Sequence, residues 1–233
     1  MSFNFISPLD WTALVWFALC WVGYALFARR KSKIKPTIAT SLSSVRGIWM
    51  NRVLTRDVRI ADVTALGILQ RNVTFFASTT MFILAGLLTV LGATEKVIEL
   101  TDTLPFIIEN TRASWEFKIL ILVFTFVYAF FKFSWSVRQY NFGIVLVGAS
   151  PDSDATQEDK DLFIVNANQI LSRANDSFAH GLRAYSFAMA LLAWFIHPVL
   201  LMVVSAWVVG VLYRREFRSY TLEALKAAGK LNY

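Results

Sequence analysis

The sequence predicts an all-α protein, a bundle of helices integrated in a membrane. Apolar residues make up 56% of the 233 residues and charged residues 17%, against roughly 45–50% and about 25% in soluble domains. The apolar residues are concentrated in four blocks, residues 9–28, 73–91, 115–133 and 184–213. A helix needs about 20 mostly apolar residues to cross a bilayer. We therefore expect residues 1–233 to form a single membrane domain.

The placement of charge separates this chain from nucleic-acid-binding proteins, although its net charge is +7. Lysines and arginines border the apolar blocks, most densely in residues 29–35, and no glycine-rich phosphate loop accompanies them. Basic residues mark the cytoplasmic side of membrane helices. The nearly uncharged N-terminus is therefore expected outside the membrane and residue 29 onward in the cytoplasm.

Helices are also predicted outside the bilayer. Residues 37–56, approximately, combine helical apolar spacing with interleaved arginines, which is typical of an amphipathic helix lying on anionic headgroups or packing on a partner helix. Residues 142–147 and 161–183 extend the third and fourth blocks as cytoplasmic helical extensions. By contrast, residues 93–114 are acidic and are expected to form an exterior loop.

The second block carries small residues on one helical face. Ser78, Ala85, Thr89 and Gly92 share this face. Small side chains let the backbones of two membrane helices approach closely. We expect this face to pack against another helix.

The fourth block has two interpretations. Its 30 residues would form a helix of about 45 Å, more than one crossing requires. Proline breaks or kinks a helix, and His197-Pro198 lies near the middle of the block. A single crossing places the basic tail after residue 213 outside, against the positive-inside rule. A hairpin that reverses at Pro198 keeps the tail in the cytoplasm, and we favour it.

Four strings resemble a bacterial membrane-protein family known as domain of unknown function 599. They are FFAST at 75–79, FSWSVRQYN at 133–141, GLRAY at 181–185 and YRREFRS at 213–219. Their order and spacing extend the resemblance over residues 10–220. The family implies a multi-pass protein of the bacterial inner membrane and brings no established activity.

Polar residues suggest two candidate sites. Arg173, Asp176, His180 and Arg183 share one helical face, and Arg138 follows the third block. This set fits either a hydrogen-bond network between helices or a site for an anion or lipid headgroup. Candidates for polar groups or helix breaks at mid-membrane are Thr80, His197 and Pro198.

No metal site or cofactor is expected, because His180 and His197 are far apart along the chain and Cys20 is the single cysteine. No catalytic motif is present, and the chain is not expected to be an enzyme. The favoured function is a scaffold, an accessory subunit or a self-assembling oligomer, with membrane lipids and a second copy or another membrane protein as partners. The alternatives are a small oligomeric channel or transporter, and a membrane enzyme or lipid-binding protein that uses the arginine face.

Overall fold

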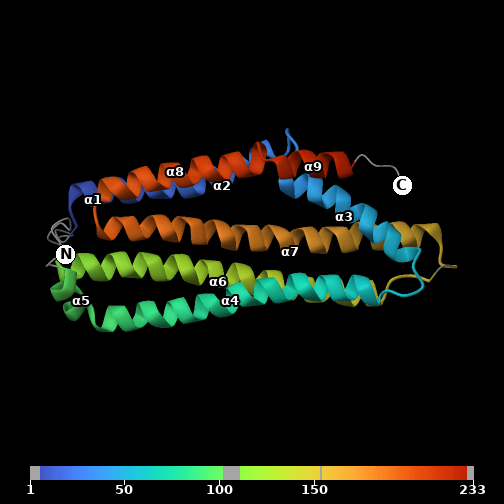
Figure 1. Cartoon of the computed structure of the whole chain (residues 1–233), viewed down its shortest axis with the longest axis horizontal. Helices are drawn as coiled ribbons and strands as arrows, with labels where there is room; N and C mark the ends of the chain where they lie inside the picture. Colours follow the sequence, from blue (N-terminus) through green and yellow to red (C-terminus); the bar gives the residue numbers. More distant parts are fainter. Residues whose placement is uncertain (1–5, 102–110, 153, 230–233) are drawn as a thin grey trace. The chain divides into compact units, whose positions relative to one another are not determined.

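A computed structural model describes residues 6–101, 111–152 and 154–229, and these residues form helices joined by short turns (Figure 1). The predicted all-α class is confirmed. The elements run in the order α1 (Pro8–Ala18), the π-helix η1 (Leu19–Gly23), α2 (Tyr24–Lys31), α3 (Ile38–Leu54), α4 (Ile60–Gly92), α5 (Thr94–Thr101), α6 (Arg112–Gly148), α7 (Gln157–Leu192), the 3₁₀ turn η2 (Ala193–Phe195), α8 (Pro198–Phe217) and α9 (Tyr220–Ala228).

Four helical segments are long and apolar enough to cross a membrane, and they define a multi-pass membrane protein. They are Pro8–Lys31, Ile60–Gly92, Arg112–Gly148 and Pro198–Ala228. The first three contain the predicted blocks, and α4 and α6 extend well beyond them. The extension of α6 includes the predicted residues 142–147. The fourth predicted block is divided between the end of α7 and α8.

Local sequence signals explain where several helices begin. The side chain of Ser7 accepts a hydrogen bond from the backbone N of Asp10, and Pro8 occupies the first helical position of α1. Thr37 and Thr40 form a capping box that starts α3 inside the predicted stretch 37–56. Within the predicted loop 93–114, the chain forms the short helix α5, while residues 102–110 lie outside the described part.

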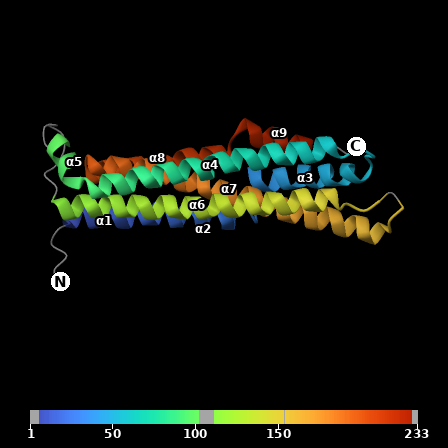
Figure 2. The same ribbon diagram turned by 90° about the horizontal axis from the view of Figure 1, so that it is seen from below.

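The chain reverses direction between α7 and α8, as the hairpin interpretation predicts. The backbone N atoms of Ile196 and His197 both donate to the carbonyl of Ala193, which closes a tight turn. Pro198 then begins α8, which runs back beside the last part of α7 (Figures 1 and 2). Proline suits this position because the first helical residue has no partner for a backbone N–H.

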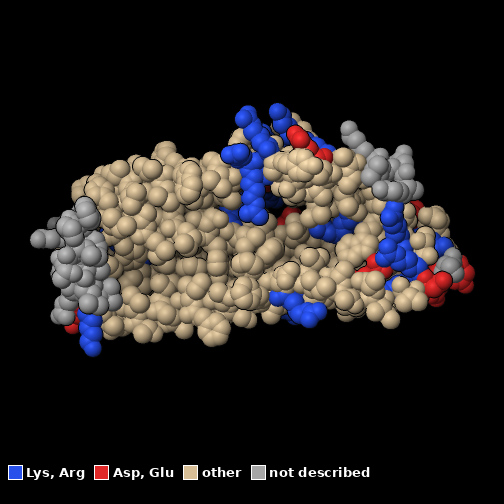
Figure 3. All heavy atoms as spheres, viewed as in Figure 1, with Lys and Arg blue, Asp and Glu red and all other residues tan. Residues whose placement is uncertain are grey.

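Two compact units can be distinguished, and each is described by itself. The first consists of Met1–Lys33, Thr79–Ala129 and Leu182–Tyr213. Its core joins side chains from α1, α6, α7 and α8, including Phe17, Leu122, Phe187, Leu191 and Leu201. Large apolar side chains such as Leu19, Phe124 and Trp207 are exposed on its sides. The flank of this unit seen over α1 and residues 198–213 of α8 in Figure 3 shows no Lys, Arg, Asp or Glu, as expected of a surface that contacts lipid.

The second unit consists of Ile34–Ser78, Phe130–Gly181 and Arg214–Tyr233. It holds α3, α9 and parts of α4, α6 and α7. Aromatic rings fill part of its interior, where Phe133 lies 5.6 Å from Phe76 and 5.8 Å from Phe178 between ring centres. Gly181 lets α7 approach this cluster closely, because a Cβ there would lie 2.4 Å from Phe133.

Candidate functional site

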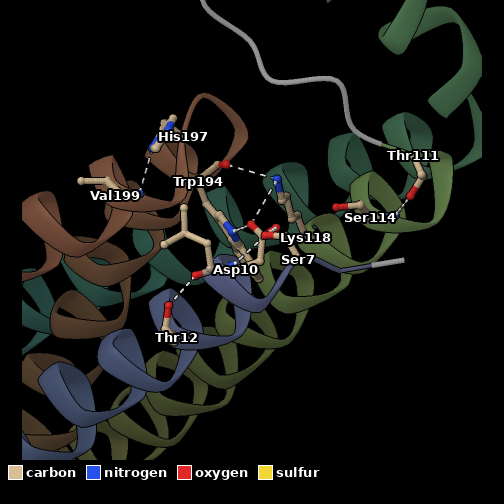
Figure 4. A network of polar contacts seen from close by, with 10 residues as sticks. Ser7, Asp10, Thr12, Thr111, Ser114, Lys118, Trp194, His197 and Val199 are labelled. Atoms are coloured by element: carbon tan, nitrogen blue, oxygen red, sulfur yellow. Dashed lines mark hydrogen bonds and ion pairs between the residues drawn. The ribbon is translucent and has the colours of Figure 1, made fainter. Parts of the chain in front are cut away.

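A buried pair of opposite charges lies at one end of the first unit (Figure 4). The Nζ of Lys118 on α6 lies 3.8 Å from Oδ1 of Asp10 on α1, and the two side chains are 2% and 8% exposed. The Nε1 of Trp194 donates to the same Oδ1 at 2.6 Å. Lys118 also donates to the carbonyl oxygen of Trp194 at 3.3 Å. Three elements distant in the sequence therefore meet at one carboxylate.

The remaining acceptor of this carboxylate is also used. Oδ2 of Asp10 accepts a hydrogen bond from the hydroxyl of Ser7 at 2.7 Å. The ammonium of Lys118 lies 5.5 Å from the ring centre of Trp194, within the range of a cation–π contact. Charges buried away from water are tolerated when they are paired and hydrogen-bonded in this way. The geometry suits a clamp that fixes α1, α6 and the end of α7.

The turn beside this clamp is capped by a histidine. Nδ1 of His197 accepts a hydrogen bond from the backbone N of Val199 at 3.1 Å, in the first turn of α8. His197 and Pro198 therefore lie at the reversal between two helices, where they satisfy the start of α8. The structure does not place them in the middle of a continuous spanning helix.

Thr80 lies in the interior of the first unit. Its side chain is completely buried, and its hydroxyl is 2.7 Å from the hydroxyl of Tyr185 on α7. The ring of Tyr185 stands edge-on to Phe126, with 5.2 Å between ring centres. Thr80 is thus part of a packed contact between α4 and α7.

The predicted arginine face is mostly exposed. Arg138, Arg173 and Asp176 are exposed, and Nδ1 of His180 hydrogen-bonds the carbonyl of Asp176 on its own helix. Arg183 belongs to the first unit, where its guanidinium lies 5.3 Å from the ring centre of Tyr24. In the described part of the chain, no carboxylate forms an ion pair with Arg138 or Arg173.

A different set of polar residues joins the helices of the second unit. Arg46 on α3 is buried, and its Nη1 donates to the hydroxyl of Ser172 on α7 at 2.8 Å. Ser172 in turn donates to Ser43 at 3.1 Å. Burial lowers the pKa of the Arg46 guanidinium, an effect opposed by the nearby Tyr140 and by the charge of Asp176. A network between helices therefore exists here, and it is built mainly from residues outside the predicted set.

Two further hydrogen bonds link α6 to α7 within this unit. The hydroxyl of Ser136 donates to the carbonyl of Ala174 at 2.7 Å. The hydroxyl of Ser177 donates to the side chain of Gln139 at 3.3 Å. Neutral side chains make these contacts, which leaves the neighbouring arginines facing outward.

The contact between Asp10 and Lys118 was not predicted from the sequence. Asp10 fits a helix start and Lys118 fits the border of an apolar block, and both roles are ordinary at those places. One feature of the sequence does point to the pair. Asp10 and Lys118 have opposite charges, and both lie at ends of apolar blocks that are expected on the outer side of the membrane. Among the described residues, no group of three His, Cys, Asp or Glu side chains is placed to hold a metal ion.

The long apolar helices and the buried polar clamp define an α-helical membrane protein of the multi-pass class. A family model described as "Protein of unknown function, DUF599" matches residues 12–221, and the chain belongs to that family. The resemblance inferred from the four strings is thereby confirmed. No curated protein and no solved structure matches the chain.

Proposed function

We propose that this protein is a non-catalytic membrane scaffold that assembles with further copies of itself through α4. The proposal places the first unit in the bilayer of a bacterial inner membrane, with the N-terminus outside. It also places the basic segment after Ala28 in the cytoplasm. The basic residues at the end of α2 support this orientation.

The observation that carries the proposal is the exposure of the small-residue face of α4. Ser78, Ala85, Thr89 and Gly92 are all exposed in the single chain, although such a face is suited to helix packing. Only 11% of the most apolar stretch of α4 is buried, against 39% for α6. A second copy of the chain would supply the missing partner for this face.

The chemistry inside the first unit agrees with a role in assembly. Asp10, Lys118 and Trp194 are joined by an ion pair and hydrogen bonds, and the hydroxyl of Thr80 is hydrogen-bonded to that of Tyr185. Apolar side chains, among them Phe126 and Leu191, form the packed core of the same unit. Such packing supports a scaffold over a polar conduit through one copy.

Binding of anionic headgroups is a second candidate function, favoured by the exposure of Arg138 and Arg173 in the second unit. Clustered arginines bind phosphate well. The double variant Arg138→Gln/Arg173→Gln tests this function when the protein in detergent is titrated with phosphatidylglycerol and bound lipid is counted by native mass spectrometry. Unchanged binding would remove the candidate.

Disulfide crosslinking in native membranes tests the scaffold proposal. In a Cys20→Ala background, Ala85→Cys is expected to give a covalent dimer on mild oxidation, because the α4 faces of two copies approach closely. Phe124→Cys is the control, since residue 124 is 68% exposed on α6 and lies off this face. Equal crosslinking at positions 85 and 124 would contradict the proposal.

A second variant tests whether close approach is needed. Gly92 is exposed on the same helical face as Ala85, and a Cβ there would meet no atom of its own chain within 4 Å. Gly92→Leu should therefore leave the fold intact and hold the two α4 helices apart. The crosslink at position 85 should fall about tenfold, as for a loss of ~1.4 kcal/mol.

A further inference from the structure

An open apolar groove runs between α1–η1–α2 and α8 in the first unit. Its volume is about 550 Å³, within the usual range for small-molecule sites. One wall comes from Trp16 to Phe27 and the other from Ala206 to Tyr213. Over residues 16–27, a helix rises about 16 Å, roughly half of a 30 Å hydrocarbon core. That is the depth of one leaflet.

Two polar contacts join the walls and mark the limits of the groove. The Nε1 of Trp16 donates to the carbonyl of Met202 at 3.1 Å. At the other limit, the Nζ of Lys31 donates to the hydroxyl of Tyr213 at 2.9 Å. The helices are therefore held together above and below a stretch that their own side chains leave unfilled.

The shape of the groove comes from its backbone. Leu19, Cys20 and Gly23 belong to the π-helix η1, a local irregularity that is often found at functional sites. Gly23 lines one wall of the groove and Gly210 the other, and a Cβ at either position would meet no other atom within 4 Å. Two glycines and a π-helix thus leave an opening in an apolar surface.

A cation stands at one limit of this apolar opening. The ammonium of Lys31 lies 4.9 Å from the ring centre of Phe27 and 4.6 Å from that of Tyr213. Both aromatic residues also line the groove. The exposed Arg29 and Arg30 precede Lys31 at the basic end of the span. An apolar groove that is as long as one leaflet is deep, and that ends at a positive charge, has the chemistry of a phospholipid site.

We propose that this groove binds an acyl chain of an anionic phospholipid, with the phosphate of the lipid held by Lys31. A glycerophospholipid matches both the apolar groove and the ammonium of Lys31, since its acyl chain is apolar and its negative charge lies in the headgroup beyond one end of that chain. A helix of a second copy would not fit, because a helix about 10 Å across and 16 Å long occupies roughly 1,250 Å³, more than twice the groove's volume of about 550 Å³. The proposal concerns a surface other than the α4 face and does not depend on self-assembly.

Photo-crosslinking with diazirine-labelled lipids tests the proposal in the full-length protein. The protein is reconstituted in phosphatidylcholine vesicles that contain a trace of either a phosphatidylglycerol probe or a phosphatidylcholine probe, each labelled on the acyl chain. Peptide mass spectrometry then counts adducts on Leu19, Phe27 and Ala206. We expect about fivefold more adducts from the phosphatidylglycerol probe, the effect of one basic side chain near an anionic lipid.

Two variants distinguish binding of the lipid's acyl chain from binding of its headgroup. Gly23→Leu/Gly210→Leu adds two side chains to the groove at positions where a Cβ meets no other atom within 4 Å, and it should reduce adducts from both probes about tenfold. Lys31→Gln should keep chain binding and abolish the preference for phosphatidylglycerol. Gly86→Leu adds the same side chain outside the groove and Lys33→Gln removes a neighbouring charge, so neither should change the labelling.

Three results would overturn the proposal. The first is equal labelling of the unaltered protein by the two probes. This result does not depend on whether any variant folds. The second is unchanged labelling when the groove is filled. The third is a crosslink from Leu19 to another protein copy in place of lipid adducts, which would assign the groove to a protein contact.

Discussion

Asp10 and Lys118 stand 3.8 Å apart at opposite ends of a 108-residue stretch of chain, both almost completely removed from the surface. The indole N–H of Trp194 donates to Asp10, and the backbone carbonyl of Trp194 accepts from Lys118, so each of the three residues contacts the other two. The contact ties the first turn of α1 and the second turn of α6 to the reversal that precedes α8. The arrangement makes a strong prediction about stability.

Replacing Lys118 by Met should destabilise the protein by about 3 kcal/mol, because a buried carboxylate loses its counter-charge. The double variant Asp10→Asn/Lys118→Met should recover much of this loss, since neither charge then remains buried alone. Thermal unfolding in detergent measures both, in a double-mutant cycle. Glu116→Gln is the control, because the side chains of Glu116 and its partner Arg112 are 34% and 60% exposed and ion pairs near the surface contribute less than ~1 kcal/mol. Equal effects at residues 116 and 118 would argue against the clamp.

The sequence predicted the helices better than their partners. The extension of α6 past the third block follows from the apolar residues 142–147, and the reversal follows from His197-Pro198 together with the basic tail. These signals lie within one segment of the chain, or they reflect the bilayer, whose thickness and charge asymmetry act on every spanning helix alike. The contact between Asp10 and Lys118 depends on which helices become neighbours, and spacing within one helix carries no information on that.

The arginine face shows the same limit at one helix. The spacing of Arg173, Asp176 and His180 correctly places them on one side of α7, but that side is largely exposed. The inward side of α7 carries Ser172, which receives Arg46 from α3. A serine is a weaker signal of a polar site in a sequence than an arginine, although its small hydroxyl side chain fits better between closely packed helices.

Arg46→Met should therefore destabilise the second unit by about 1–3 kcal/mol, because the hydroxyl of Ser172 loses a charged donor. Arg173→Met, at an exposed position on α7, should change the unfolding free energy by less than about 0.5 kcal/mol. Chemical unfolding in mild detergent compares the two variants. If Arg173 proved the more costly position, the predicted arginine face would regain its structural role.

Gly181 should not tolerate even alanine. A Cβ at residue 181 would lie 2.4–2.7 Å from three ring atoms of Phe133, and Phe76 and Phe178 hold that ring in place. Overpacking of this kind costs about 1–3 kcal/mol, more than the gain of up to ~1 kcal/mol from the helix preference of alanine. Gly67→Ala on α4 is the matched control, because its Cβ meets no atom within 4 Å. Gly67→Ala should raise the melting temperature and Gly181→Ala should lower it. A stabilising Gly181→Ala would show that the aromatic cluster can rearrange.

The reversal between α7 and α8 predicts which segments share a side of the membrane. Lys33 follows α2, Arg218 follows α8, and Ile196 is 44% exposed at the turn. In a Cys20→Ala background, a membrane-impermeant maleimide should label Lys33→Cys and Arg218→Cys from the same side. It should label Ile196→Cys from the opposite side, because α8 returns across the bilayer. Labelling of Lys33→Cys and Arg218→Cys from opposite sides would instead support a single crossing by residues 184–213. The basic tail would then lie on the side that the positive-inside rule disfavours.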